Sequence, residues 1–141
     1  MTDDELLAQF ESCTLPFEQW THRAHVKIAF LYLRESSFQV ALRKIRQGIQ
    51  AYNKANSVAD APKQGYNETT THAILQLIRT TSLAYGEEFP TPDADSFCET
   101  HPQLMSKHVL RLFYSPERRM HPEAKTCFIE PDLAPLPKVV N

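Results

Sequence analysis

The chain has few cysteines, and their positions exclude two common ways of stabilising a small protein. Only three occur among the 141 residues, Cys13, Cys98 and Cys127, and no C-x-x-C pair is present. An odd number of widely spaced cysteines supports neither a disulfide framework nor a zinc site made of thiolates. We therefore expect reduced thiols and one domain, spanning residues 1–141, that is held together by an apolar core.

The chain also lacks a long apolar run and an excess of charge of one sign. No stretch approaches the roughly 20 apolar residues of a membrane-spanning helix, and the acidic start, MTDDE, differs from the basic start of a signal peptide. The formal net charge of −2 creates no field that would favour nucleic acid or an anionic membrane. We therefore expect a cytoplasmic protein with no nucleic-acid partner and no membrane partner.

What the sequence has in quantity is helical periodicity, because apolar residues recur at spacings of three and four. A capping box at Thr2 and Glu5 predicts the first helix, Pro16 separates it from the second, and Asn67 is a suitable N-cap for the fourth. The prediction is four long helices, over residues 3–12, about 17–35, 38 to just before 56, and 68 to about 85.

The last third of the chain is less regular. Residues 87–100 hold five acids and no lysine or arginine, so we expect a surface connection there with at most a short helix after Asp93. Residues 104–114 are expected to be helical, and the proline-rich run at 131–137 predicts an extended tail. The predicted fold class is therefore all-α, a single compact bundle of about five or six helices with an extended C-terminal tail.

Two histidines at a spacing of three are the first candidates for a functional site. His22 and His25 share the face of the second helix that carries its apolar residues, so each needs a hydrogen-bond or metal partner. Two histidines and a carboxylate from two helices can form a three-ligand site with an open position. One interpretation is therefore a divalent transition metal, zinc or iron, bound by His22, His25, Glu68 and His72.

Two other interpretations remain open. Without a metal, a histidine oriented by Glu68 can act as an acid or base, which makes His22, His25 and Glu68 catalytic. The substrate-binding residues of such a pocket are then Trp20, Tyr66, Thr69 and Arg111, with Arg111 as an inward cation for a carboxylate or phosphate. In the third interpretation the histidines are structural, and Glu68 and a buried water satisfy them.

Several motifs resemble those of a family of small bacterial proteins. They are W-T-H-x-x-H at residues 20–25, R-x-x-I-x-x-Y-N at 46–53, G-Y-N-E-T at 65–69 and P-D-L-A-P-L-P at 131–137. The resemblance covers almost the whole chain but implies no activity. The family pattern has a histidine where this chain has Asn67. If that histidine is a ligand, metal binding is weakened here, whereas if it caps a helix, asparagine serves equally well.

Two functions from different classes follow. The first is a small-molecule-binding protein or enzyme, metal-dependent in one version, with a polar pocket of His22, His25 and Glu68 between the second and fourth helices. The alternative is a non-catalytic interaction module with structural histidines, which forms a homodimer through the third helix. A cleft that reaches His25 and Glu68 favours the first function, whereas sealed histidines and an exposed apolar patch favour the second.

Overall fold

The long helices of the protein begin where the sequence supplies a capping side chain. In the computed structural model, which describes residues 1–138, Thr2, Thr21, Ser37 and Asn67 each accept a hydrogen bond from the backbone of the helix that follows. Such a bond satisfies one of the free N–H groups at a helix start. The α-helices are α1 (Asp3–Glu11), α2 (His22–Glu35), α3 (Phe38–Ala55), α4 (Glu68–Tyr85), α5 (Ala94–Thr100), α6 (Pro116–Arg119) and α7 (Pro122–Thr126), and the 3₁₀ turns are η1 (Phe17–Gln19), η2 (Pro102–Leu104) and η3 (Val109–Leu112).

The all-α prediction is confirmed, since residues 1–138 contain helices and turns but no β-strand. The four long helices lie close to their predicted bounds. The second begins later than expected, because residues 17–19 form the separate turn η1 and Thr21 then caps α2 through a bond from Ala24 N.

The helix expected over residues 104–114 is not formed; the turn η2 ends at Leu104, and the only helical turn beyond it in this range is η3, at Val109–Leu112. In a continuous helix the carbonyl of Leu104 would accept a hydrogen bond from the amide of His108. Here His22 Nε2 binds Leu104 O at 2.8 Å, while the amide of His108 donates to Ser106 Oγ at 3.1 Å. A tertiary contact and a local serine thus replace the helical bond, which periodicity alone does not reveal.

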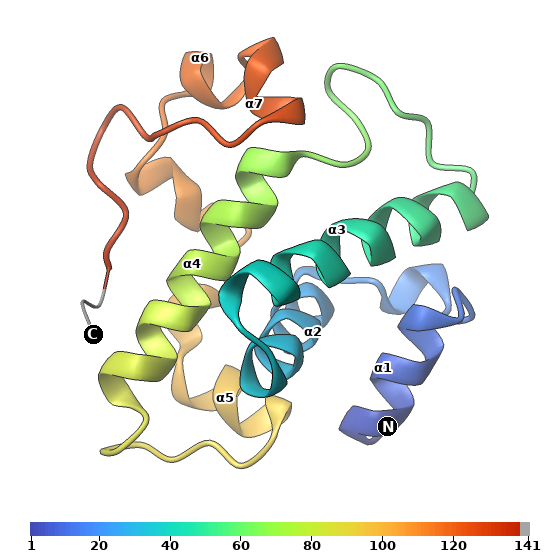
Figure 1. Ribbon diagram of the computed structural model, residues 1–141, viewed down its shortest axis with the longest axis vertical. Helices are drawn as coiled ribbons and strands as arrows, with labels where there is room; N and C mark the ends of the chain where they lie inside the picture. The colour runs from blue at the N-terminus through green and yellow to red at the C-terminus, as the bar shows by residue number, and fades with distance from the viewer. Residues whose placement is uncertain (139–141) are drawn as a thin grey trace.

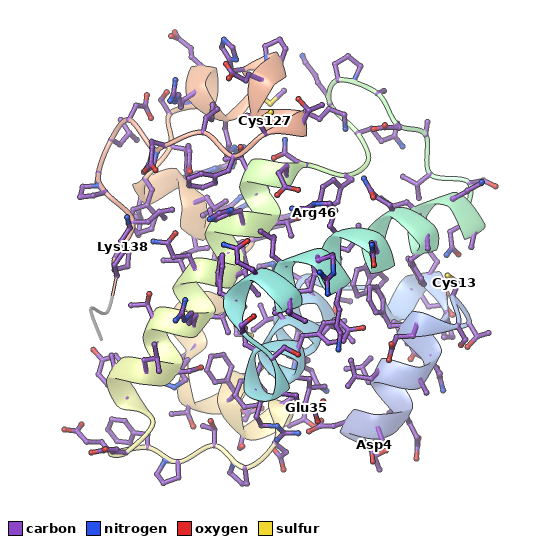
Figure 2. The ribbon with its side chains drawn as sticks, in the orientation of Figure 1. Asp4, Cys13, Glu35, Arg46, Cys127 and Lys138 are labelled. Carbon is purple, nitrogen blue, oxygen red and sulfur yellow. The ribbon has the colours of Figure 1, made fainter. Side chains whose placement is uncertain are left out.

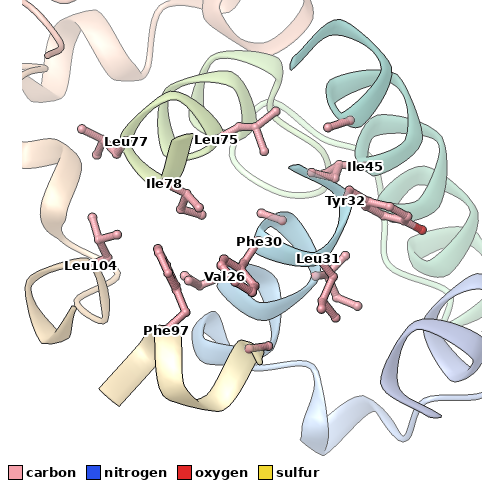
Figure 3. Close-up of a cluster of buried hydrophobic side chains, with 14 of the residues drawn as sticks. Val26, Phe30, Leu31, Tyr32, Ile45, Leu75, Leu77, Ile78, Phe97 and Leu104 are labelled. Atoms are coloured by element: carbon pink, nitrogen blue, oxygen red, sulfur yellow. The ribbon is translucent and has the colours of Figure 1, made fainter. Parts of the chain in front are cut away.

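Helix α2 lies at the centre of the core. It packs against α3, α4 and α5, and Figure 3 shows side chains from all four helices meeting around Val26 and Phe30. Phe30 stacks on Phe97 of α5 at 4.6 Å between ring centroids, and Phe97 is completely buried. The segment expected at the surface therefore contributes its short helix to the core, while the acids of α5 face outward and pair with Arg23 and Lys27 of α2.

The C-terminal segment forms the expected extended tail beside α4 (Figure 1). The carbonyl of Pro137 accepts hydrogen bonds from Gln76 and Thr80 of α4, and Leu136 is buried against the body. Its prolines, which cannot continue a helix, leave this segment extended, and two side chains of α4 bind its backbone at Pro137.

None of the helices described within residues 1–138 has both the length and the apolar character needed to cross a bilayer. Even α2, whose circumference is mostly covered, carries Arg23, Lys27 and Arg34 on its outer stripe. These cations reach acids or a backbone carbonyl of the neighbouring 92–99 segment. Their role in the fold is therefore to fasten α5 and the loop before it onto α2.

Candidate functional site

The two histidines lie in the first turns of α2, where the cap formed by Thr21 sets the direction of the helix. Their spacing of three places both side chains toward α4 and the segment that contains η2 and η3. They line the same cavity, as the sequence predicts for a shared face. Their surroundings differ, however, because one has a hydrogen-bond partner and the other has none.

His22 is held by a backbone carbonyl. Its Nε2 lies 2.8 Å from Leu104 O, and because a carbonyl oxygen only accepts, this ring nitrogen must carry the proton and donate. The bond fixes both the tautomer and the orientation of the ring. It also ties the start of α2 to the turn η2, so His22 forms part of the wall of the cavity and part of the fold.

His25 has a buried nitrogen that no other group of the described chain reaches. Its ring lies edge-on to Trp20, with 3.8 Å between centroids, and its Nε2 has no hydrogen-bond partner within residues 1–138. Burial, together with the neighbouring His22, lowers the pKa of His25 to about 4. The imidazole is therefore neutral near pH 7, with Nε2 free to donate or accept one hydrogen bond.

A cavity of about 270 Å³ lies beside His25, between α2, α3 and α4. Its wall is mostly apolar and includes Phe10, Trp20, Ile28, Ile45, Ile74 and Leu75. Its polar groups other than the cations are His22, His25, Tyr66, Asn67, Thr70 and Thr71. The lining residues Gly65, Thr70 and Lys107 are exposed, so the mouth lies between the start of α4 and the loop after η2. An apolar chamber with a few convergent polar groups is typical of small-molecule sites.

Glu68 does not join the histidines, contrary to the sequence prediction. Its carboxylate accepts two hydrogen bonds of 2.8 Å from Arg46, which Figure 2 labels on α3, and a third of 2.7 Å from Tyr66. Burial raises the pKa of Glu68, but the hydrogen bonds from Arg46 and Tyr66 outweigh it and the net shift is downward. The helical wheel correctly predicted a buried carboxylate, but an arginine two turns along α3 provides its partner.

His72 and Thr69 also lie outside the cavity. His72 stacks on Phe128 at 3.9 Å and meets Phe38 edge-on, so its ring packs between α3 and the C-terminal segment. Thr69 is completely buried, where its hydroxyl donates to Cys127 O and accepts from Ile129 N. Both predicted roles are corrected, because these side chains attach the C-terminal segment to α4.

The predicted metal set is consequently not assembled. Within residues 1–138 no group of three or more His, Cys, Asp or Glu side chains is arranged to hold a metal ion. His22 and His25 line the cavity, whereas Glu68 bonds to Arg46 and Tyr66, and His72 lies between aromatic rings. Helix spacing predicted the facing direction of each residue, but the relative positions of two helices depend on packing that spacing does not describe.

The remaining predicted residues divide between the cavity and the surface. Trp20 and Tyr66 line the cavity, and Asn67, which also lines it, caps α4 through a bond from Thr70 N at 2.9 Å. Arg111 is exposed and lies outside the lining. The cations that do line the cavity are Lys107 and Arg119. The local basic character of residues 107–119 was the available signal, but no periodic helix exists there to show which of its cations face inward.

Comparison with known proteins adds no assignment to this geometry. No protein-family model, no curated protein and no solved structure matches the chain. The function must therefore be argued from the cavity and the side chains that line it.

Proposed function

We propose that this protein binds a small organic molecule in the cavity between α2, α3 and α4, with His25 as its hydrogen-bonding partner. The observation that carries the proposal is the buried Nε2 of His25, which no group of residues 1–138 satisfies and which belongs to a side chain lining the cavity. Buried polar atoms in folded proteins nearly always have a partner. A ligand in the cavity supplies one.

The neutral state of His25 supports binding rather than general acid–base chemistry. A catalytic histidine is usually oriented and made more basic by a carboxylate, and the candidate for that role, Glu68, bonds to Arg46 and Tyr66 instead. With its pKa lowered to about 4, His25 keeps a single N–H and one acceptor nitrogen at neutral pH. It is suited to recognise a hydroxyl, carbonyl or amide of a ligand.

The outer face of α3 gives little support to the alternative of a dimerisation module. Among residues 1–138, the large apolar side chains that are most exposed include Phe17, Leu112 and Leu133, and none of them lies on α3. That face instead carries exposed charged and amide side chains, among them Arg43, Lys44 and Gln47. A stable dimer normally needs an apolar contact region.

The proposal is tested by screening small molecules with the fluorescence of Trp20, which is the only tryptophan of the chain and lines the cavity. Compounds that change the emission and raise the melting temperature are then titrated against two variants. His25→Phe removes the hydrogen bond and is expected to weaken binding at least about tenfold. His72→Phe is the matched control, since it changes a helix histidine that packs between aromatic rings away from the cavity.

The proposal fails if every compound that binds does so equally well to the wild type and to His25→Phe. It fails equally if a diverse library yields no compound that perturbs Trp20. Loss of binding in both histidine variants would indicate a general effect on folding, which circular dichroism of the two variants identifies. In that case His25→Gln, which restores a polar nitrogen at a similar position, is the variant that decides.

A further inference from the structure

Two cations line the cavity without an acidic partner in the described part of the chain. Lys107, in the loop between η2 and η3, and Arg119, the last residue of α6, both line the cavity. Within residues 1–138, neither side chain pairs with an aspartate or a glutamate. Arg23, Arg46 and Lys125, in contrast, each pair with an acidic side chain. Two positive charges at one cavity are therefore available to a ligand.

No acid compensates for these charges from the cavity wall. The described lining contains neither aspartate nor glutamate, although the chain as a whole has a formal net charge of −2. The charges of Arg111, Lys107 and Arg119 also lower the pKa of the neighbouring exposed His108. The positive potential is thus a local property of this site and not a consequence of a basic protein.

The interior of the cavity suits the apolar part of a ligand. Its inner wall is formed by buried side chains such as Phe10, Ile28, Ile45 and Leu75, and the volume is about 270 Å³. An apolar cavity of about 150 Å³ already accepts a molecule the size of benzene. There is room here for a ring or a branched aliphatic group with a short chain that leads to the mouth.

We infer that the ligand is an apolar anion, a small hydrophobic body that carries one carboxylate or phosphate group held by Lys107 and Arg119. This inference rests on the proposed function and specifies the ligand class. The guanidinium of Arg119 can bind a carboxylate or phosphate through two N–H groups, and the ammonium of Lys107 adds a point charge. His25, deeper in the site, can hydrogen-bond either a polar atom on the hydrophobic part of the ligand or an oxygen of its anionic group.

The test uses three probes that share a phenyl ring on a four-carbon chain and differ in the terminal group: 4-phenylbutanoate, 4-phenylbutanol and 4-phenylbutylammonium. Each is titrated against the wild-type protein, with Trp20 fluorescence as the readout. The carboxylate is expected to bind at least about tenfold more tightly than the alcohol, and the ammonium more weakly than both. Raising the salt concentration should weaken binding of the carboxylate and leave binding of the alcohol nearly unchanged.

The double variant Lys107→Met/Arg119→Met tests whether these two cations are responsible. It is expected to reduce the affinity for 4-phenylbutanoate about tenfold or more while the affinity for 4-phenylbutanol stays within a factor of about two. Arg111→Met is the matched control, because it removes a neighbouring cation that does not line the cavity. The methionine side chains keep much of the apolar stem, so the fold is preserved.

Each result decides the inference. Preference for the carboxylate that disappears in the double variant and persists in Arg111→Met supports it. Equal or tighter binding of the alcohol or the ammonium overturns it while leaving the proposed function intact, since the cavity then binds a small molecule of another class. Failure of all three probes to bind also overturns it, and the library screen with His25→Phe decides the proposed function separately.

Discussion

The two histidines of α2 show how residues with the same local geometry acquire different properties. Both lie on one face of the helix and both line the cavity. His22 donates to Leu104 O and so belongs to the fold, whereas the Nε2 of His25 is buried without a partner. Leaving a buried nitrogen unsatisfied costs roughly 1–3 kcal/mol of stability. A ligand that bonds to this atom recovers part of that free energy.

The lowered pKa of His25 predicts a specific loss of stability in acid. The unfolded chain binds a proton near pH 6.5, but the folded protein does so only near pH 4, so the free energy of unfolding falls as the pH falls between these values. At about pH 4.5 this single group should cost the wild type about 2–3 kcal/mol. Urea denaturation of the wild type and of His25→Phe at about pH 7 and about pH 4.5 measures it.

The comparison isolates His25, because the other groups with shifted pKa values, Glu68 and His72 among them, titrate in both proteins. The variant should therefore lose less stability on acidification than the wild type. If both lose the same amount, His25 accepts its proton without cost in the folded state. That result would contradict its burial.

At the scale of elements, an ion pair between Arg46 and Glu68 joins α3 to the start of α4. Arg46 of α3 and Tyr66, just before α4, both donate to Glu68 in the first turn of α4. The side chain of Glu68 is 9% exposed and that of Arg46 is 37% exposed. Water can therefore hydrate the arginine if its partner is removed, but it reaches the carboxylate far less.

This difference in exposure predicts unequal effects of removing either partner. Arg46→Met leaves a buried carboxylate with only Tyr66 as donor and should lower the free energy of unfolding by about 3 kcal/mol. Glu68→Gln keeps an oxygen acceptor and leaves a hydrated arginine, so its cost should be about 1–2 kcal/mol. Chemical denaturation of the two variants at neutral pH gives both values. A larger loss in Glu68→Gln would show that the carboxylate is better hydrated than its exposure indicates.

The contact between α1 and α3 also shapes the cavity. A Cβ atom at Gly48 of α3 would clash with Cε2 and Cζ of Phe10, so only glycine allows this ring to approach the helix so closely. Phe10 in turn stacks on Trp20 at 4.9 Å and lines the cavity. Glycine in the middle of α3 weakens the helix slightly, but it allows α1 to supply part of the cavity wall.

At the scale of the whole molecule, a lysine of α7 joins the C-terminal region to the loop between α3 and α4. Figure 1 shows this loop and α7 near the start of α4. Lys125 of α7 donates to Gln64 O and Tyr66 O, and it pairs with Asp60 at 2.8 Å. Because Gly65, Tyr66 and Asn67 line the cavity, the position of α7 helps to determine its shape.

Lys125→Met should therefore loosen this loop without unfolding the core. The variant leaves two carbonyls without their donor, and we expect a loss of about 1–2 kcal/mol in local stability. Hydrogen exchange of the amides between residues 58 and 67 should become faster, while the amides of α2 keep their protection. Lys63→Met, which changes an exposed lysine in the same loop, is the control. Unchanged exchange in Lys125→Met would show that the loop is held by other contacts.

The local features of this protein were predictable because they depend on residues close in sequence. The caps at Thr2 and Asn67 and the apolar spacing identified the four long helices and the starts of α1, α3 and α4. The start of α2 was predicted near residue 17, and its cap at Thr21 was missed. The same spacing correctly placed the two histidines on one face and predicted a buried Glu68. Each of these properties follows from helix geometry, in which the direction of a side chain is determined by its position along the chain.

The partners of those side chains were decided only when the helices packed. Arg46 binds Glu68 from 22 positions away and so removes it from the predicted site. His22, which lies 82 positions from Leu104, donates to the carbonyl oxygen that a continuous helix at 104–114 would have used for the amide of His108. Spacing gives the direction in which a side chain points, but the order and tilt of packed helices decide which groups it meets. That is why the histidine pair could be found in the sequence, while the cavity with Lys107 and Arg119 beside it exists only in the folded chain.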